Sequence, residues 1–129
     1  MKYTEKEVLQ FIEENDVKFV RLMFFDIFGT TKNISIMADE LPVAFKKGVT
    51  FNASAIGGFE NFDADLVLVP DPATLAVLPW RPQHGRVVRL FCTITYQNGV
   101  PFDADVRMVL KNAMKRAASV LSLIHISEP

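Results

Sequence analysis

The first segment of the chain has the hydrophobic spacing of an amphipathic helix. Thr4 and Glu7 lie three residues apart, as in a capping box, where each side chain accepts a hydrogen bond from the other residue's backbone amide. Apolar residues follow on one helical face at Val8, Leu9, Phe11 and Ile12. The pattern predicts a helix over residues 5–14 that ends at Asn15 and Asp16.

Two runs rich in β-branched and aromatic residues come next, at 17–25 and 31–37. Gly29 lies between them and supplies a turn, so the pair predicts a β-hairpin. A short helix should follow, capped by Asp39 and ended by Gly48. Its apolar stripe and its first-turn proline are Leu41, Pro42, Ala44 and Phe45.

The segment 51–59 interrupts these helix and strand patterns with small residues and glycines. Its apolar positions, which can anchor a loop at either side, are Phe51, Ile56 and Phe59. Composition alone allows two interpretations. The segment is either a connecting loop packed on its own domain or a loop that carries binding chemistry.

Three more strands are predicted at 66–69, 75–78 and 86–96. One side of the longest strand is purely apolar and should face the core, through Val88, Leu90, Cys92 and Ile94. An Asn-Gly turn and a last helix opened by Asp105 follow. The order of elements predicts an α+β fold with a β-grasp-like sheet, in which two hairpins grip a helix.

Composition narrows the class of protein. Half of the 129 residues are hydrophobic, which suffices for the core of one domain or of one domain plus the beginning of another. The net charge of -1 gives no electrostatic argument for nucleic acid or for an anionic membrane. No apolar run approaches the roughly 18 residues that a bilayer span needs, and the polar start is unlike a secretory signal. We therefore expect a cytoplasmic protein without nucleic-acid or membrane partners.

The residues alone present no complete active site. The sequence contains no Walker phosphate loop, no His-Glu-x-x-His motif and no Cys/His metal spacing. His84 has no recognisable triad partners. The single cysteine, Cys92, lies in an apolar strand pattern and is predicted to be a buried structural thiol.

Two charged groups of residues leave alternatives open. Asp63 and Asp65 either contact a cation together or belong to a solvated loop. Three arginines near Trp80 either form a positive patch or lie at strand edges with their charged ends in water, namely Arg81, Arg86 and Arg89. Trp80 itself is predicted to serve packing.

Several segments match one known family in their order and spacing. They are Val20–Gly29 followed by Lys32 and Asn33, then Phe51–Phe59, Asp65–Asp71, Leu78–Trp80 and Pro101–Arg107. Over about residues 3–117 the chain resembles the N-terminal region of bacterial-type (type I) glutamine synthetases. The resemblance implies a β-grasp domain over 1–103 and the first helix of a catalytic domain over 104–120. We interpret residues 121–129 as a non-native tail, in which His125 has no function.

The resemblance also implies an activity and an assembly. In that family the active sites form between the β-grasp domain and the catalytic domain of the adjacent subunit, in a homododecamer of two stacked hexameric rings. The reaction joins ammonia to L-glutamate through γ-glutamyl phosphate, with ATP and Mg²⁺ or Mn²⁺. The family therefore predicts a glutamate–ammonia ligase whose partners are like subunits, glutamate, ammonium and ATP.

The candidate site residues are Asn52 and Ser54, on the loop that the family donates to the neighbouring subunit. Family members read Phe-Asp-Gly-Ser-Ser there, and the Asp helps to bind ammonium and to take its proton. Here Asn52 replaces that Asp, and an amide is neither charged nor a useful base at neutral pH. Three alternatives follow. The protein is a glutamine synthetase that is slower or that uses other groups on ammonium, a γ-glutamyl-amine or polyamine ligase of the same superfamily, or a non-catalytic assembly or regulatory module.

A second departure concerns the ATP and metal site. The family's ATP- and metal-binding carboxylates, including a Glu-x-Glu pair on a strand, lie beyond the helix with which this chain ends. We therefore interpret the chain as a truncated fragment that binds no cofactor. The 129-residue chain alone is predicted to be inactive.

Overall fold

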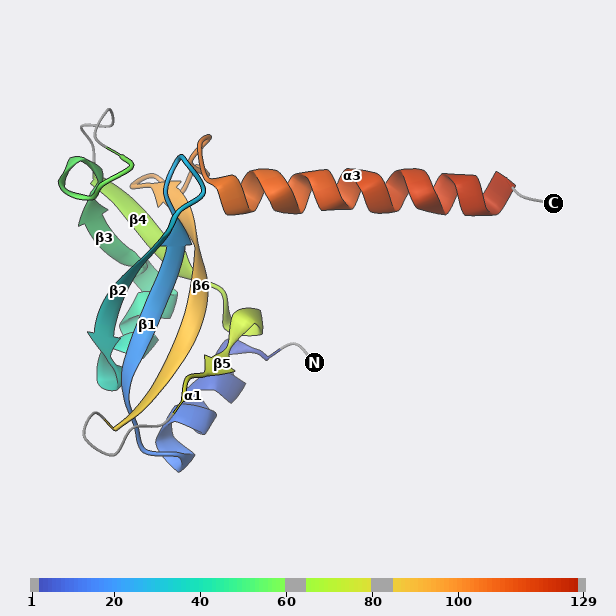
Figure 1. The fold of residues 1–129 in the computed structure, drawn as a ribbon. Helices are drawn as coiled ribbons and strands as arrows, with labels where there is room; N and C mark the ends of the chain where they lie inside the picture. The colour runs from blue at the N-terminus through green and yellow to red at the C-terminus, as the bar shows by residue number, and fades with distance from the viewer. Residues whose placement is uncertain (1–2, 60–64, 80–84, 128–129) are drawn as a thin grey trace.

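A six-stranded mixed sheet forms the body of the protein (Figure 1). The computed structural model describes residues 3–59, 65–79 and 85–127, with the backbone alone for 124–127. The strands are β1 Val17–Phe25, β2 Thr31–Met37, β3 Val49–Asn52, β4 Asp65–Pro70, β5 Ala76–Val77 and β6 Arg86–Tyr96. Their order is β2-β1-β6-β4-β3, with β5 beside β6. β1 and β6 run parallel, and the other pairs are antiparallel.

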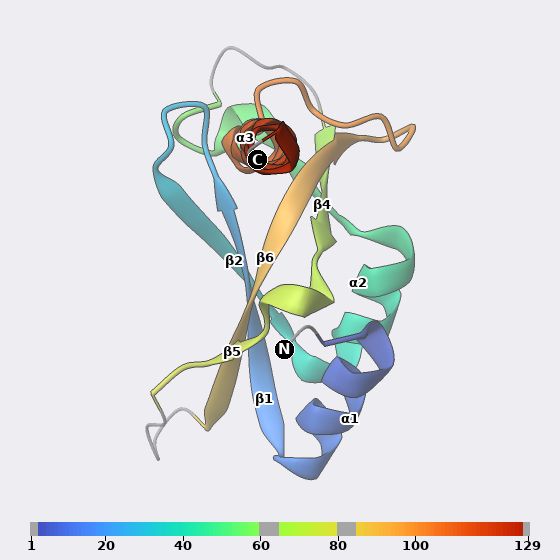
Figure 2. The ribbon, with the colours of Figure 1, turned by 90° about the vertical axis from the view of Figure 1, so that its right-hand side faces the viewer.

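Two helices cover one face of this sheet, α1 (Glu5–Glu14) and α2 (Leu41–Lys47), as Figure 2 shows. The predicted capping box of α1 is confirmed, because Thr4 and Glu7 each accept from the other's backbone amide. The predicted cap of α2 is wrong. Asp39 lies in a 3-10 turn, η1 (Ala38–Glu40), and the Glu40 carboxylate accepts from the Met37 amide at 2.8 Å instead.

The buried core lies between these helices and the sheet. The predicted alternation of β6 is confirmed, since its four apolar residues are at most 1% exposed, at Val88, Leu90, Cys92 and Ile94. Phenylalanine rings pack on one another in this core. The ring of Phe24 lies 5.2 Å from that of Phe51 and 6.1 Å from that of Phe59. Contacts of this kind add to the burial of the rings themselves.

The segment 51–59 differs from the loop that its composition predicts, because it begins as a strand. Val49 and Thr50 are β-branched residues that favour strands, and β3 pairs with β4 from Val49 opposite Leu68 to Asn52 opposite Asp65. A 3-10 turn, η2 (Ala53–Ala55), follows directly. β5 is shorter than the predicted 75–78 strand and follows another 3-10 turn, η3 (Pro72–Thr74).

The last helix, α3 (Val106–Ser127), projects away from the sheet (Figures 1 and 2). Asp105 precedes it and caps it, as predicted, by accepting from the Arg107 amide at 3.2 Å. From Val109 to Leu123 every residue of α3 is exposed. The helix continues past residue 120 without a break, and the nature of residues 121–129 stays a prediction.

Together these elements confirm the predicted α+β, β-grasp-like fold. The β1–β2 turn, the η2 segment and the start of α3 all lie at the same end of the sheet, at the top of Figure 1. The candidate site residues belong to this end.

Candidate functional site

Asn52 and Ser54 form a single hydrogen-bonded unit at the end of β3. Asn52 Oδ1 accepts from the Ser54 amide at 3.0 Å and from Ser54 Oγ at 2.7 Å. Both side chains are exposed, whereas Ala53 between them is fully buried. The buried alanine and the closed turn therefore present the Asn52 amide and the Ser54 hydroxyl together at the surface.

A carboxylate stands opposite this unit. Asp65 begins β4 and is the cross-strand partner of Asn52, so their side chains share one face of the sheet. Directly opposed residues of this kind have Cβ atoms about 5 Å apart. Asp63, the other member of the acidic pair, lies outside the described residues. A cation shared by Asp63 and Asp65 therefore stays a prediction.

The loop that follows Ser54 rests on the β1–β2 turn, a contact that the sequence patterns did not indicate. Asp26 is 3% exposed and its Oδ1 accepts from the amides of Phe28 and Thr30, at 2.9 and 2.8 Å. Gly58 packs directly against this carboxylate. An aspartate three residues before a turn glycine is the signal that would have pointed to Asp26 as a turn-forming residue.

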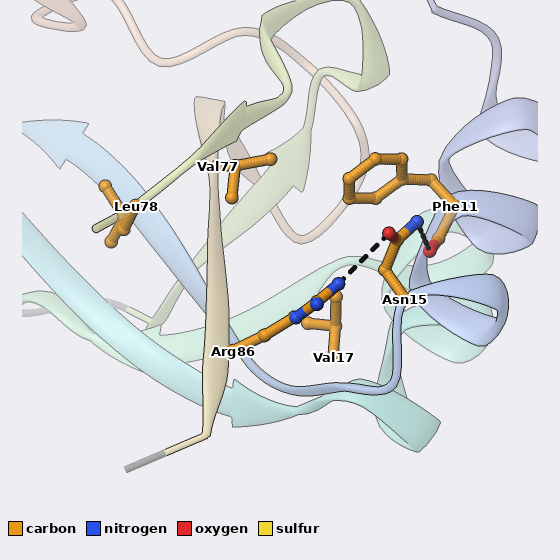
Figure 3. A pocket seen from close by; sticks show the side chains of 6 residues that line it. All are labelled: Phe11, Asn15, Val17, Val77, Leu78 and Arg86. Carbon is orange, nitrogen blue, oxygen red and sulfur yellow. Dashed lines mark hydrogen bonds between the residues drawn. The ribbon is translucent and has the colours of Figure 1, made fainter. Parts of the chain in front are cut away.

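The described arginines do not form one positive patch. Arg86 reaches across a pocket of about 260 Å³ toward α1, as Figure 3 shows, and its Nη1 donates to Asn15 Oδ1 at 3.1 Å. Arg89 instead stacks on the ring of Phe91, with 4.6 Å from Cζ to the ring centre, and donates to the Thr74 carbonyl. Arg81 and Trp80 lie outside the described residues.

A separate charged group fixes the start of α3. Arg107 Nη2 donates to Asp71 Oδ2 at 2.7 Å, and Lys111 Nζ lies 3.6 Å from the same oxygen. Burial by itself raises the pKa of Asp71. Hydrogen bonds from Arg107 and from the Ala73 amide lower this pKa, as do the positive charges of Arg107 and Lys111. Together they hold the pKa of Asp71 below its usual value. This cluster is an anchor for the helix rather than an open site.

Asp105 is fully buried beside this anchor. One of its oxygens accepts from the Ile94 amide of β6 at 2.9 Å, and the other caps α3. Burial raises the pKa of Asp105 above its usual value, against the lowering effect of these bonds and of Arg107. The side chain therefore ties the helix to the central strand.

Cys92 is buried, as predicted, and burial raises the pKa of its thiol to about 12. The thiol is therefore protonated at neutral pH and is no nucleophile. His84 lies outside the described residues, and only the backbone of His125 is described. Neither histidine can be placed in a site.

The described part of the chain contains no group of candidate metal ligands. It brings no three His, Cys, Asp or Glu side chains close enough together to hold a metal ion. Within the same residues, no helix combines the length and apolar character of a membrane span. The neutral pair Asn52 and Ser54 can donate and accept hydrogen bonds but cannot by itself take a proton from a substrate.

Comparison with known sequences supports the resemblance seen in the motifs. Residues 16–97 match the model of the family described as "Glutamine synthetase, beta-Grasp domain". A glutamine synthetase of Clostridium saccharobutylicum is 42% identical over 113 residues, which cover 87% of this chain and 26% of the relative. One of Halobacterium salinarum is 44% identical over 115 residues, 88% of this chain and 25% of the relative. The chain thus spans about a quarter of the length of these curated relatives.

Solved structures agree in fold. The structure of GmaS without ligand superposes with a TM-score of 0.72 at 28% identity, over 86% of this chain and 26% of that one. Glutamine synthetase of Plasmodium falciparum gives a TM-score of 0.75 over 92% of this chain and 24% of that one, at an identity of 20% that shows the fold alone. The family match covers more than half of the chain and includes the whole sheet. The chain belongs to the glutamine synthetase family, and its sheet is the β-grasp domain of that family.

Proposed function

We propose that this chain is the β-grasp part of a glutamine synthetase, which joins ammonia to L-glutamate with ATP through γ-glutamyl phosphate. The observation that carries the proposal is the exposed Asn52–Ser54 unit, held on a β-grasp sheet that belongs to this family. In the proposal the unit enters the active site of a neighbouring subunit. Cytoplasmic location, two stacked hexameric rings, and Mg²⁺ or Mn²⁺ on a part of the enzyme outside the described residues stay predictions from the resemblance.

The Asn52–Ser54 unit would meet ammonium through Ser54 Oγ, because this hydroxyl donates its proton to Asn52 Oδ1 and can accept a hydrogen bond from ammonium with its lone pairs. Asn52 Oδ1 already accepts two bonds from Ser54, which fixes the orientation of the amide. The negative charge that an amide lacks is available from Asp65, the cross-strand partner of Asn52. A carboxylate on the neighbouring strand attracts a small cation, and more strongly once the site closes and excludes water.

A chimeric enzyme tests the proposal. Residues 3–117 of this chain would replace the aligned segment of the Clostridium saccharobutylicum relative, and glutamine formation would be measured against ammonium concentration. We expect an active chimera, with kcat/KM for ammonium lowered at least about tenfold by Asn52→Ala or by Asp65→Asn. Asn98→Ala is the matched control, because Asn98 also accepts a bond in an exposed turn, from the Val100 amide. It should change activity less than twofold.

The alternatives have distinct outcomes in the same assay. A chimera that prefers a polyamine or ethanolamine to ammonium would point to a γ-glutamyl-amine ligase. A folded and assembled chimera without activity toward any amine would point to a non-catalytic module. Unchanged activity in Asn52→Ala and Asn52→Asp would remove the loop from the site.

The 129-residue chain by itself should give no γ-glutamyl hydroxamate with ATP and Mg²⁺ or Mn²⁺. The family resemblance implies that the ATP and metal site belongs to another part of the enzyme. Measurable hydroxamate formation by the purified chain would contradict this assignment.

A further inference from the structure

The β1–β2 turn is built around the buried side chain of Asp26. Besides the two bonds that Oδ1 accepts from Phe28 and Thr30, the Asp26 amide donates to the Thr30 carbonyl at 2.9 Å. The Gly29 amide donates to the Asp26 carbonyl at 3.0 Å. These four bonds fix the carboxylate at one place at the end of the sheet, and a charged acceptor makes two of them strong.

Gly58 lies against this carboxylate and has no room for a side chain. An added Cβ would overlap the Asp26 carboxyl group, and the backbone φ of +91° is one that other residues rarely adopt. The Ile27 amide points to the Gly58 carbonyl at 3.5 Å, so the backbones of the two loops also meet. The approach of this loop to the turn therefore depends on both residues.

The same loop carries the candidate site residues. Phe51 and Phe59 anchor its two ends in the core by packing on each other and on Phe24. Between these two buried residues lies the exposed Asn52–Ser54 unit. The core thus fixes the ends of the loop, and the contact of Gly58 with Asp26 holds it against the hairpin.

We propose that Asp26 and Gly58 are a positioning pair, which sets where Asn52 and Ser54 stand relative to the sheet. The pair touches no substrate and acts through the loop. Its effect on ammonium use rests on the proposed function, whereas its effect on the position of the loop does not. The two effects can therefore be measured separately.

The structural test uses the full 129-residue chain and its amide NMR spectrum. Gly58→Ala should shift the amide resonances of Asn52 and Ser54, because the new methyl group pushes the loop off the carboxylate. Gly99→Ala is the matched control, since Gly99 has nearly the same φ, +85°, and nothing within 4 Å of an added Cβ. In an Asp26→Gly background Gly58→Ala should shift Ser54 by less than half as much, because all the Asp26 side-chain atoms that the new methyl group overlaps are then absent.

The functional test uses the active chimera. Gly58→Ala should raise the KM for ammonium at least about tenfold and leave the KM for glutamate within twofold, since misplacing a positioned group by about 1 Å can cost up to about 10²-fold. Asp26→Asn keeps the size of the side chain and one oxygen acceptor. Asp26→Asn should raise the KM for ammonium by a smaller factor. It replaces Gly58→Ala in the test if that variant fails to fold.

The outcomes separate the two ideas. Shifts at Ser54 in Gly58→Ala but not in Gly99→Ala, together with the rise in ammonium KM, support the positioning pair and the role of the loop. The same shifts with unchanged ammonium kinetics support the pair and overturn the proposed function of the loop. Unshifted Ser54 resonances in folded Gly58→Ala, or in Asp26→Asn where the alanine variant is unfolded, overturn the positioning pair.

Discussion

The sheet and α3 are stabilised in contrasting ways. In the sheet, buried side chains from α1, α2, β1, β3, β4 and β6 converge on one continuous core. In α3, the residues from Val109 to Leu123 are exposed, including large apolar ones such as Leu110, Met114 and Leu121. The sheet therefore has its own source of hydrophobic stabilisation, whereas α3 depends on what holds its first turn.

The largest expected effect contrasts the two regions directly. Phe24→Ala removes a fully buried ring that packs on Phe51 and Phe59, and should lower the free energy of unfolding by about 3–5 kcal/mol. Met114→Ala, on the exposed part of α3, should change it by less than about 0.5 kcal/mol. Urea unfolding followed by circular dichroism measures both. If both variants lost the same free energy of unfolding, α3 would be packed in solution, and the contrast between the sheet and α3 would be wrong.

A smaller effect is expected where the two regions join. Asp105→Ala leaves the buried Ile94 amide without its acceptor and removes the cap of α3, at a cost of about 2–3 kcal/mol. Asp103→Ala, two residues earlier and exposed, is the control and should cost less than about 0.5 kcal/mol. Hydrogen exchange should rise in the first turns of α3 only in Asp105→Ala. Similar exchange in both variants would mean that the cap does not hold the helix.

The smallest effect is the pH dependence of the Asp71–Arg107 ion pair. The folded pKa of Asp71 lies below its usual value of 3.8, so the stability that its carboxylate contributes is present above pH 3.8 and is lost as the pH falls through the folded pKa. Asp71→Asn should lower stability by about 1 kcal/mol at pH 6 and flatten this acid loss. Unfolding curves from pH 6 to pH 3 provide the measurement, and parallel pH profiles would refute the assignment.

Asp105 provides a second test, because its pKa is shifted in the opposite direction from that of Asp71. Its folded pKa is raised, so its contribution to stability is present below the usual value and declines as the pH rises through the folded pKa. As the pH falls, the stability from Asp105 therefore increases above pH 3.8, before the acid loss from Asp71 begins below pH 3.8. Asp105→Asn should remove the increase above pH 3.8, and Asp71→Asn should reduce the loss below it.

The regular elements of this fold were predictable because their signals are local. The capping box of α1, the hairpin of β1 and β2, and the alternation of β6 all follow from residues close together in sequence. Strand β3 was not predicted, because the glycines and alanines of 51–59 indicate a loop. The β-branched pair Val49 and Thr50 just before it was the available signal for β3.

The candidate site was only partly predictable. Asn52 and Ser54 came from the family resemblance, and composition gave no more than a loop of uncertain role. The contact of Asp26 with Gly58 and the pairing of Asn52 with Asp65 join residues that are distant in sequence. Such pairings depend on how the strands are ordered and registered, which a single sequence does not reveal.

The parallel pairing of β1 with β6 has a consequence for the order of folding. β6 is the last strand in the sequence, yet it lies at the centre of the sheet, between β1 and β4. A nascent chain can close the β1–β2 hairpin early, but it cannot complete the sheet until β6 has left the ribosome and found β1, a slow non-local search. A chain that stops after residue 79 should show no cooperative unfolding transition. During synthesis the apolar residues of β1 therefore stay exposed to solvent until β6 has been made and has paired with β1.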